Sequence, residues 1–112
     1  MKTDGAEVSV VIAYQAQPGQ GETAGRELAA LIATAVSTEP DCRGIRLLQD
    51  AADADRLVLI ERWTSEAAFT GPHMTTPHLQ AFMQRAPGFL AGPPQIRLLR
   101  ELAAAQPDGS AA

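Results

Sequence analysis

The stretch from Leu57 to Leu79 constrains the fold most, because a strand, a short helix and a second helix must follow one another within it. Its apolar run Leu57–Ile60, followed by Glu-Arg-Trp, is typical of a buried strand that reaches its polar end. The next two residues, Thr64-Ser65, are good N-caps, so a helix can begin at once. Gly71-Pro72 interrupts that helix. Thr76-Pro77 then predicts a new one, with threonine as N-cap and proline at the first helical position.

Periodicity predicts the remaining elements on both sides of this stretch. Apolar residues recur every three or four positions between residues 20 and 37, which indicates an amphipathic helix that Glu39-Pro40 ends. The expected strands are Val8–Tyr14, Ile45–Gln49, Arg56–Trp63 and Gln95–Leu102. The apolar stripes are Leu28, Leu31, Ile32, Ala35 and Val36 in the first helix, and Leu79, Phe82, Met83 and Ala86 after Pro77. The resulting βαββαβ order, with the second helix in two pieces, predicts an α+β, ferredoxin-like fold: one antiparallel sheet with helices on one face.

Length and composition limit the classes of protein that this chain can belong to. Its 112 residues suffice for one domain, which we expect over residues 1–102, with residues 103–112 as a disordered tail. A net charge of −4 without a basic cluster argues against nucleic-acid binding. The longest apolar run is too short to span a bilayer and no signal-peptide core follows Met1, so we expect a cytoplasmic protein without membrane contact. The single cysteine, Cys42, predicts a buried or half-buried thiol rather than a disulfide.

Both faces of the predicted sheet are apolar, although the helices can cover only one of them. In the first strand, one phase holds Val8, Val10, Ile12 and Tyr14 and the other holds Val11 and Ala13; the third and fourth strands show the same feature. An exposed apolar face of this kind is usually an interaction surface. A second copy, packed sheet to sheet about a two-fold axis, is the simplest cover, so we expect a homodimer. The alternative is a monomer whose open face binds a large apolar ligand.

Three fragments carry a family resemblance: EPDC at residues 39–42, LVLIERW at 57–63 with the following SEAAF helix, and HMTTPHLQAF from residue 73. They resemble the E-P-G-C-like turn, the strand ending in E-x-W and the H-x-x-[ST]-P-H motif of the antibiotic biosynthesis monooxygenase superfamily. The resemblance implies a dimeric α+β barrel. It also implies one of several activities: cofactor-free oxygenation of anthrones and quinols, haem breakdown, or isomerisation of a signal molecule. Haem breakdown is disfavoured, because Ile12 and Met83 stand where that branch has asparagine and histidine. One residue more than usual separates Trp63 from His73.

The resemblance and the residue types together suggest cofactor-free oxygenation of an electron-rich phenol or quinol. The substrate anion passes an electron to dioxygen, so the protein must supply an apolar pocket, a base, and donors for the developing negative charge. We predict His73 and Trp63 as catalytic residues: His73, or else His78, as the base, and Trp63 Nε1 or Arg62 to hold the anion. The predicted substrate-binding residues are Tyr14, Glu61, Phe69, His78, Phe82 and Met83.

Each of these residues has a plainer interpretation, and the function therefore has two candidates. Trp63 can be a core residue, His78 a surface or capping residue, and Glu61 half of an ion pair with Arg46 or Arg97. We expect no metal, flavin or nicotinamide, because the chain has no G-x-G-x-x-G after a strand and no cysteine–histidine cluster. The favoured function is a cofactor-independent monooxygenase acting on a phenolic, quinol or polyketide-like aromatic. The alternative is a non-catalytic small-molecule-binding or stress-related protein with the same fold.

Overall fold

A computed structural model describes residues 6–107 of the chain and places four strands and the helices of an α+β fold in them. The strands are β1 (Val8–Gln15), β2 (Cys42–Gln49), β3 (Arg56–Trp63) and β4 (Gln95–Leu99). The helices are α1 (Gly21–Thr38), α2 (Glu66–Thr70) and α3 (Pro77–Arg85), with 3-10 turns η1 (Pro72–Thr75) and η2 (Ala86–Gly88). Residues 108–112 of the predicted tail lie outside the described residues.

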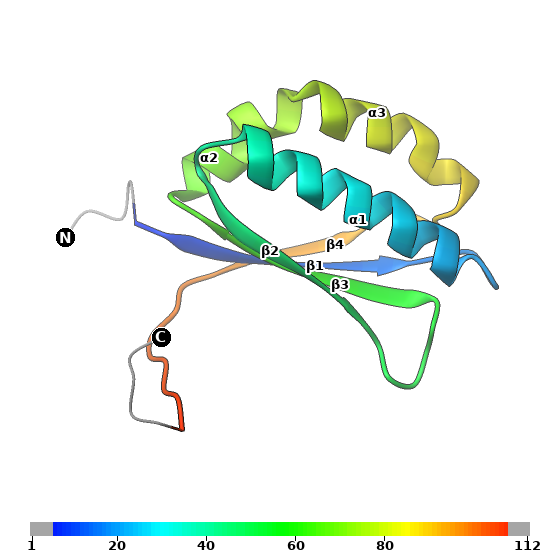
Figure 1. Cartoon of the computed structure of the whole chain (residues 1–112), viewed down its shortest axis with the longest axis horizontal. Helices are drawn as coiled ribbons and strands as arrows, with labels where there is room; N and C mark the ends of the chain where they lie inside the picture. The colour runs from blue at the N-terminus through cyan, green and yellow to red at the C-terminus, as the bar shows by residue number, and fades with distance from the viewer. Residues whose placement is uncertain (1–5, 108–112) are drawn as a thin grey trace.

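The strands form one antiparallel sheet in the order β2-β3-β1-β4, and the helices all lie on one face of it (Figure 1). This confirms the predicted ferredoxin-like fold, including the hairpin between β2 and β3. Helix α1 packs against β2 and α3, so α1 and α3 lie side by side above the sheet (Figure 1). None of the helices in residues 6–107 is both long enough and apolar enough to cross a membrane.

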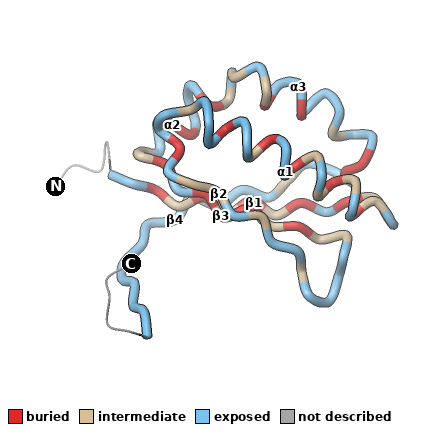
Figure 2. The backbone as a smooth tube through the Cα atoms, viewed as in Figure 1, coloured by how far each residue is buried: buried red, intermediate tan, exposed pale blue. Residues whose placement is uncertain are grey.

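The core lies between the sheet and the helices, where alternate residues of the two central strands are buried (Figure 2). The register places Val10 opposite Glu61 and Ile12 opposite Leu59, so these side chains share the face below the helices. The other face has no helix over it among the described residues, and it carries Leu48 and Leu99 as exposed apolar side chains. The buried residues of the core face are Val8, Val10, Ile12 and Tyr14 in β1, and Leu57, Leu59, Glu61 and Trp63 in β3.

The interrupted helix is confirmed, and its local contacts explain the break. Ser65 caps α2, because its hydroxyl oxygen accepts a hydrogen bond from the Ala68 N–H at 3.1 Å. A Cβ at Gly71 would come within 2.8 Å of the Ala67 carbonyl oxygen, so glycine permits the close turn that ends α2. Thr76 is the N-cap residue of α3 and Pro77 its first helical residue, as predicted, although the Thr76 hydroxyl makes no capping hydrogen bond and donates to the His73 carbonyl oxygen at 2.9 Å.

Two further predictions differ from the structure near the ends of elements. Strand β4 stops at Leu99 rather than Leu102, because its ladder to β1 ends at the pair between Ser9 and Leu99. Val36 is 46% exposed, because α1 turns this side chain away from the sheet, whereas the other predicted stripe residues of α1 are at least partly buried. Cys42 is buried, as predicted, and burial raises the pKa of its thiol.

Candidate functional site

A cavity of about 660 Å³ lies between the core face of the sheet and the helices, and most of its wall is apolar. Four polar side chains interrupt that wall: Tyr14, Gln17, Glu61 and His73. The remaining lining residues come from all four strands, the helices, the two 3-10 turns and the segment before β4, and include Leu31, Ile32, Leu59, Phe69, Met74, Phe82, Met83, Leu90 and Pro93. The volume suits a small aromatic molecule, because ligand cavities generally range from about 300 to 1,000 Å³.

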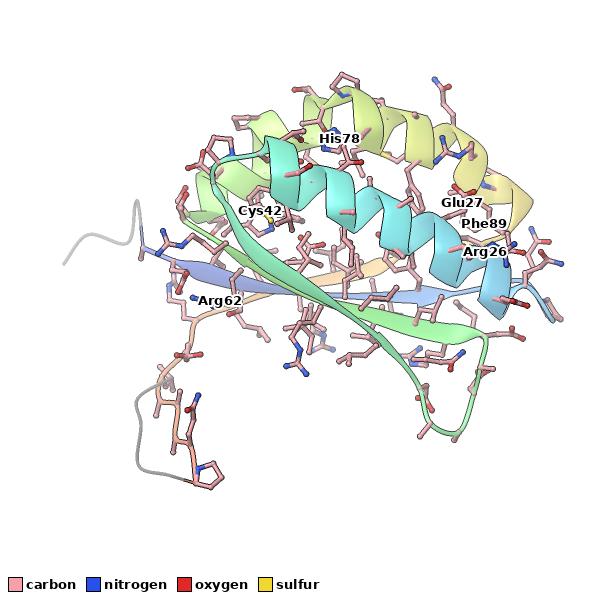
Figure 3. The ribbon with its side chains drawn as sticks, in the orientation of Figure 1. Arg26, Glu27, Cys42, Arg62, His78 and Phe89 are labelled. Carbon is pink, nitrogen blue, oxygen red and sulfur yellow. The ribbon has the colours of Figure 1, made fainter. Side chains whose placement is uncertain are left out.

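Six of the eight residues predicted for the site line this cavity, and two do not. The six are Tyr14, Glu61, Phe69, His73, Phe82 and Met83. Met83 is 55% exposed, so it stands where the cavity opens, whereas the other five are buried. Trp63 and His78 are absent from the wall, so the structure does not bring these two predicted residues to the cavity surface. Arg62 points to the opposite side of the sheet, near Glu7 (Figure 3).

Glu61 finds its partner on its own strand rather than in an arginine. The Trp63 Nε1–H donates a hydrogen bond to Glu61 Oε1 at 2.8 Å, and both side chains are buried. The predicted ion pair with Arg46 or Arg97 is wrong, because the register sets Arg46 opposite Ile60 and Arg97 opposite Val11, on the other face of the sheet. A buried carboxylate loses hydration, which raises the pKa of Glu61 to about 7 despite the bond from Trp63.

Tyr14 shares the polar part of the wall with Glu61. Burial raises the pKa of the Tyr14 phenol above its ordinary value, and the negative charge of Glu61 raises it further. The phenol therefore stays protonated at neutral pH and can donate a hydrogen bond into the cavity. The ring of Tyr14 also packs edge-on against Phe82, which fixes its position in the wall.

His73 is held between aromatic rings at the wall of the cavity. Its ring lies 4.6 Å from that of Trp63 and stacks on Phe69 at 5.4 Å, measured between centroids. The side chain is only 7% exposed. His73 is therefore buried, although Gly71-Pro72 adds one residue to the usual spacing between Trp63 and this histidine. Trp63 contacts Glu61 at one end and His73 across its ring, so it joins the two polar groups of the wall.

Glu39 is the residue that the sequence analysis missed. Its carboxylate lies 2.9 and 3.0 Å from His73 Nδ1 and 2.6 Å from His78 Nε2, so both histidines of the chain converge on one acid. The sequence analysis treated Glu39 only as the end of a helix and as part of the EPDC fragment. Pro40 does force the backbone of Glu39 into an extended conformation, and this turn aims the carboxylate at η1 and α3.

The engagement of His73 Nδ1 by Glu39 leaves the other ring nitrogen for the cavity. Nε2 of His73 has no hydrogen-bond partner within residues 6–107, while the ring lines the cavity wall. A carboxylate on Nδ1 favours the tautomer with its proton there, so Nε2 presents a lone pair. The arrangement is that of a general base oriented by an acid.

The sequence profile described as antibiotic biosynthesis monooxygenase matches residues 7–85, which include Glu39 and the four polar residues of the cavity wall but not the lining residues that follow α3. The chain belongs to the antibiotic biosynthesis monooxygenase family. Among solved structures, PA3566 from Pseudomonas aeruginosa shares 31% identity, with a TM-score of 0.78 over 88% of this chain and 96% of that one. Rv0793 from Mycobacterium tuberculosis shares 27% identity, with a TM-score of 0.76 over 90% and 100%. SO0527 from Shewanella oneidensis has a TM-score of 0.77 over 89% and 95%, and its 19% identity supports the fold alone. No curated protein matches the chain.

In this monooxygenase-family protein, one group of side chains in residues 6–107 has the composition of a metal site. The ligand-competent atoms of Glu39, His73 and His78 all lie within 4.8 Å of one another. The sequence analysis expected no metal, because the chain has no cysteine–histidine cluster and Glu39 was not among the candidate ligands. Figure 3 shows His78 in the helix layer, and its bond to Glu39 places it behind the cavity wall rather than in it.

Proposed function

We propose that this protein is a cofactor-independent monooxygenase that oxidises a phenolic, quinol or polyketide-like aromatic in the cavity, with His73 as the general base. The observation that carries the proposal is the pairing of His73 with Glu39 at the wall of an otherwise apolar cavity. A hydrogen-bonded acid behind an imidazole stabilises the imidazolium that forms when the base takes a proton. A cavity that only held an apolar molecule would not require such a pair.

The reaction begins with transfer of the substrate's phenolic proton to His73 Nε2. The phenolate then gives one electron to dioxygen, and the resulting substrate radical and superoxide combine to form a new carbon–oxygen bond. The positive imidazolium, close to the cavity, favours the negatively charged oxygen species. The peroxide's oxygen–oxygen bond breaks as the adjacent carbon loses its hydrogen, so one oxygen atom stays on the substrate and the other leaves as water. A quinol thereby becomes a hydroxyquinone.

Glu61 and Tyr14 are proposed to assist the later step of the reaction, in which the departing oxygen needs a proton and a substrate oxygen needs a hydrogen-bond donor. With a pKa near 7, a substantial fraction of Glu61 is protonated at neutral pH and can give a proton to the departing oxygen. Trp63 acts as a positioning residue, since its Nε1–H holds Glu61 Oε1 while its ring packs against His73. The Tyr14 hydroxyl is placed to donate a hydrogen bond to a substrate oxygen.

The test is oxygen uptake with a panel of quinols and anthrones, comparing wild type, H73A and W63F, with R26A as a surface control. We expect turnover by wild type and R26A, a loss of at least about 100-fold in kcat for H73A, and a smaller loss for W63F. Thermal unfolding checks that each variant is folded. Turnover that H73A leaves unchanged would overturn the choice of base.

The second candidate, a non-catalytic binding protein, is supported by the largely apolar lining of the cavity. The same panel separates the two functions when binding is measured by quenching of Trp63 fluorescence, because Trp63 is the only tryptophan. Several ligands that bind without any oxygen uptake above buffer would favour the binding protein.

We also propose that the protein is a homodimer whose uncovered sheet faces meet. Val58 and Ile60 of β3 lie on the face without helices, together with Leu48 and Leu99. The segment after β4 runs away from the sheet on that same side and carries Leu102 at 96% exposure (Figure 1). Sedimentation equilibrium should give the dimer mass for wild type and the monomer mass for V58K, whereas a monomeric wild type at micromolar concentration would refute the dimer.

A further inference from the structure

We infer that Glu39, His73 and His78 form a binding site for a divalent transition-metal ion of the zinc class. Each residue belongs to a different part of the helix layer: the C-cap of α1, the turn η1 and the first turn of α3. Their ligand-competent atoms converge to within 4.8 Å of one another, although 34 and 39 residues separate Glu39 from the two histidines. The inference goes beyond the proposed oxygenase, because Glu39 and His78 lie outside the cavity wall and only His73 belongs to both sites.

The distances require only a small adjustment to admit a metal ion. Bonds of about 2.0–2.2 Å in a tetrahedral site separate neighbouring ligand atoms by roughly 3.3–3.5 Å. The carboxylate oxygens now lie 2.9 Å from His73 Nδ1 and 2.6 Å from His78 Nε2, so each histidine nitrogen needs to move away from the Glu39 oxygens by less than an ångström. Three protein ligands leave the fourth position for water or another small ligand.

The ligand types select the class of metal. Two imidazole nitrogens and one carboxylate oxygen suit Zn²⁺, Co²⁺, Ni²⁺ or Fe²⁺, whereas Mg²⁺ and Ca²⁺ prefer sites made of oxygen atoms alone. The surroundings also favour a cation. Glu39 follows the C-terminal end of α1, where the helix dipole contributes partial negative charge.

The side chains are held in place before any metal arrives. His73 is fixed by the rings of Trp63 and Phe69, and Glu39 by the turn at Pro40. The exposed fractions are 11% for Glu39, 7% for His73 and 18% for His78, so the site is largely shielded from water and His78 lies on its most accessible side. Such preorganisation lowers the ordering cost that a flexible surface site would incur on binding.

Metal binding has a consequence for the proposed base, and this consequence rests on the proposed function. A metal on His73 Nδ1 requires the neutral imidazole to keep its proton on Nε2, the nitrogen that faces the cavity. His73 can therefore act as a metal ligand or as the base, but not as both at once. Zinc is expected to slow oxygen uptake for that reason.

The experiment measures metal binding without reference to activity. Wild-type protein is freed of metal by chelation and dialysis, then titrated calorimetrically with Zn²⁺, and with Co²⁺ while its visible absorption is recorded. The variants are E39Q and H78Q, with C42S as the matched control, since Cys42 is a buried thiol close enough to Glu39 for that charge to raise the pKa of the thiol. The chain has two histidines in all, so no histidine outside the site can supply the signal.

We expect wild type and C42S to bind one Zn²⁺ per chain and to show the intense visible bands of four-coordinate Co²⁺. Loss of one ligand should weaken binding by more than the 10- to 100-fold that is typical of losing a mere supporting residue. Circular dichroism checks that both variants are folded. Absence of stoichiometric binding by wild type, or equal affinity in H78Q, would overturn the site. Either result leaves the proposed function intact, because oxygen uptake is measured separately on metal-free protein.

Discussion

Helix α1 has a carboxylate at each end, one from the β2–β3 turn and one from its own C-cap residue, and their hydrogen-bond partners differ. At the N-terminal end, Asp55 accepts hydrogen bonds from the Gly19 and Gly21 N–H groups at 3.0 and 2.9 Å. At the C-terminal end, roughly 27 Å away by the rise of an 18-residue helix, Glu39 bonds to His73 and His78.

The helix dipole shows why this difference matters. A carboxylate at a helix N-terminus is stabilised by about 0.3–1 kcal/mol, and one near a C-terminus is destabilised by a similar amount. Asp55 therefore stands where the fold benefits from its charge, whereas Glu39 stands where the helix opposes it. The helix dipole disfavours the charge of Glu39, and the two histidines offset this effect. We therefore infer that Glu39 serves the reaction rather than the stability of the fold. Substitutions of Glu39, Gly21 and Asp55 test whether the C-terminal end of α1 serves the reaction and its N-terminal end serves stability.

The largest expected effect is on turnover, in E39Q. Glutamine keeps the shape of Glu39 and can still accept one N–H, but it carries no charge to stabilise the His73 imidazolium. We expect kcat for oxygen uptake to fall about 100-fold, while the free energy of unfolding changes little. In D55N, kcat should equal that of wild type. Full turnover by E39Q would show that the charge of Glu39 is not needed for the reaction.

A third carboxyl, the buried Glu61, adds a prediction about how stability depends on pH. Its pKa is about 7 in the folded protein against an ordinary 4.5, so its protonated form is favoured by folding. The stability that it contributes is therefore fully present below pH 4.5 and is lost as the pH rises through 7, by up to about 3 kcal/mol. Urea unfolding from pH 4.5 to 8 should show this loss in wild type. The loss should be much smaller in E61Q, and an identical pH dependence in both proteins would refute the assignment.

At the N-terminal end of α1, Gly21 is expected to be needed for packing. A Cβ there would lie 2.1 Å from the Ala54 carbonyl oxygen and 2.8 Å from Asp55 Oδ1, so G21A must displace the β2–β3 turn. We expect unfolding to become easier by about 2 kcal/mol. The matched control is G25A in the same helix, where a Cβ meets nothing within 4 Å and alanine should stabilise by about 0.5–1 kcal/mol. Equal effects of the two substitutions would show that space at Gly21 is not limiting.

The sequence predicted the fold well because the fold depends on local pattern. Periodicity predicted the βαββαβ order, and Gly71-Pro72 marked the break between α2 and η1, whereas the core face was left open because both phases of β1 and β3 are apolar. The strand β4 was predicted too long, since the end of an edge strand depends on how far its neighbour extends.

The site was predicted less completely, because its decisive contacts join distant residues. The convergence of Glu39 with His73 depends on where α1 ends relative to η1, and no spacing in the sequence fixes that. The Glu61–Trp63 bond was within reach of sequence reasoning, because residues two apart in a strand share a face. Excluding the two arginines as partners of Glu61 instead required the strand register, which the sequence did not reveal.

The smallest expected effect is that of D55N on stability. Asparagine has one acceptor oxygen, so it can keep the bond to Gly21 or to Gly19 but not both, and it loses the favourable charge at the helix N-terminus. We expect a loss of about 1 kcal/mol in the free energy of unfolding, with faster hydrogen exchange at the amide that is released. The control is E22Q, which removes an exposed charge of the first turn, paired with Arg26, and should cost a few tenths of a kcal/mol. If D55N instead lowered kcat in the folded protein, both ends of α1 would serve the reaction. The inference that Asp55 acts on stability and Glu39 on catalysis would then be wrong.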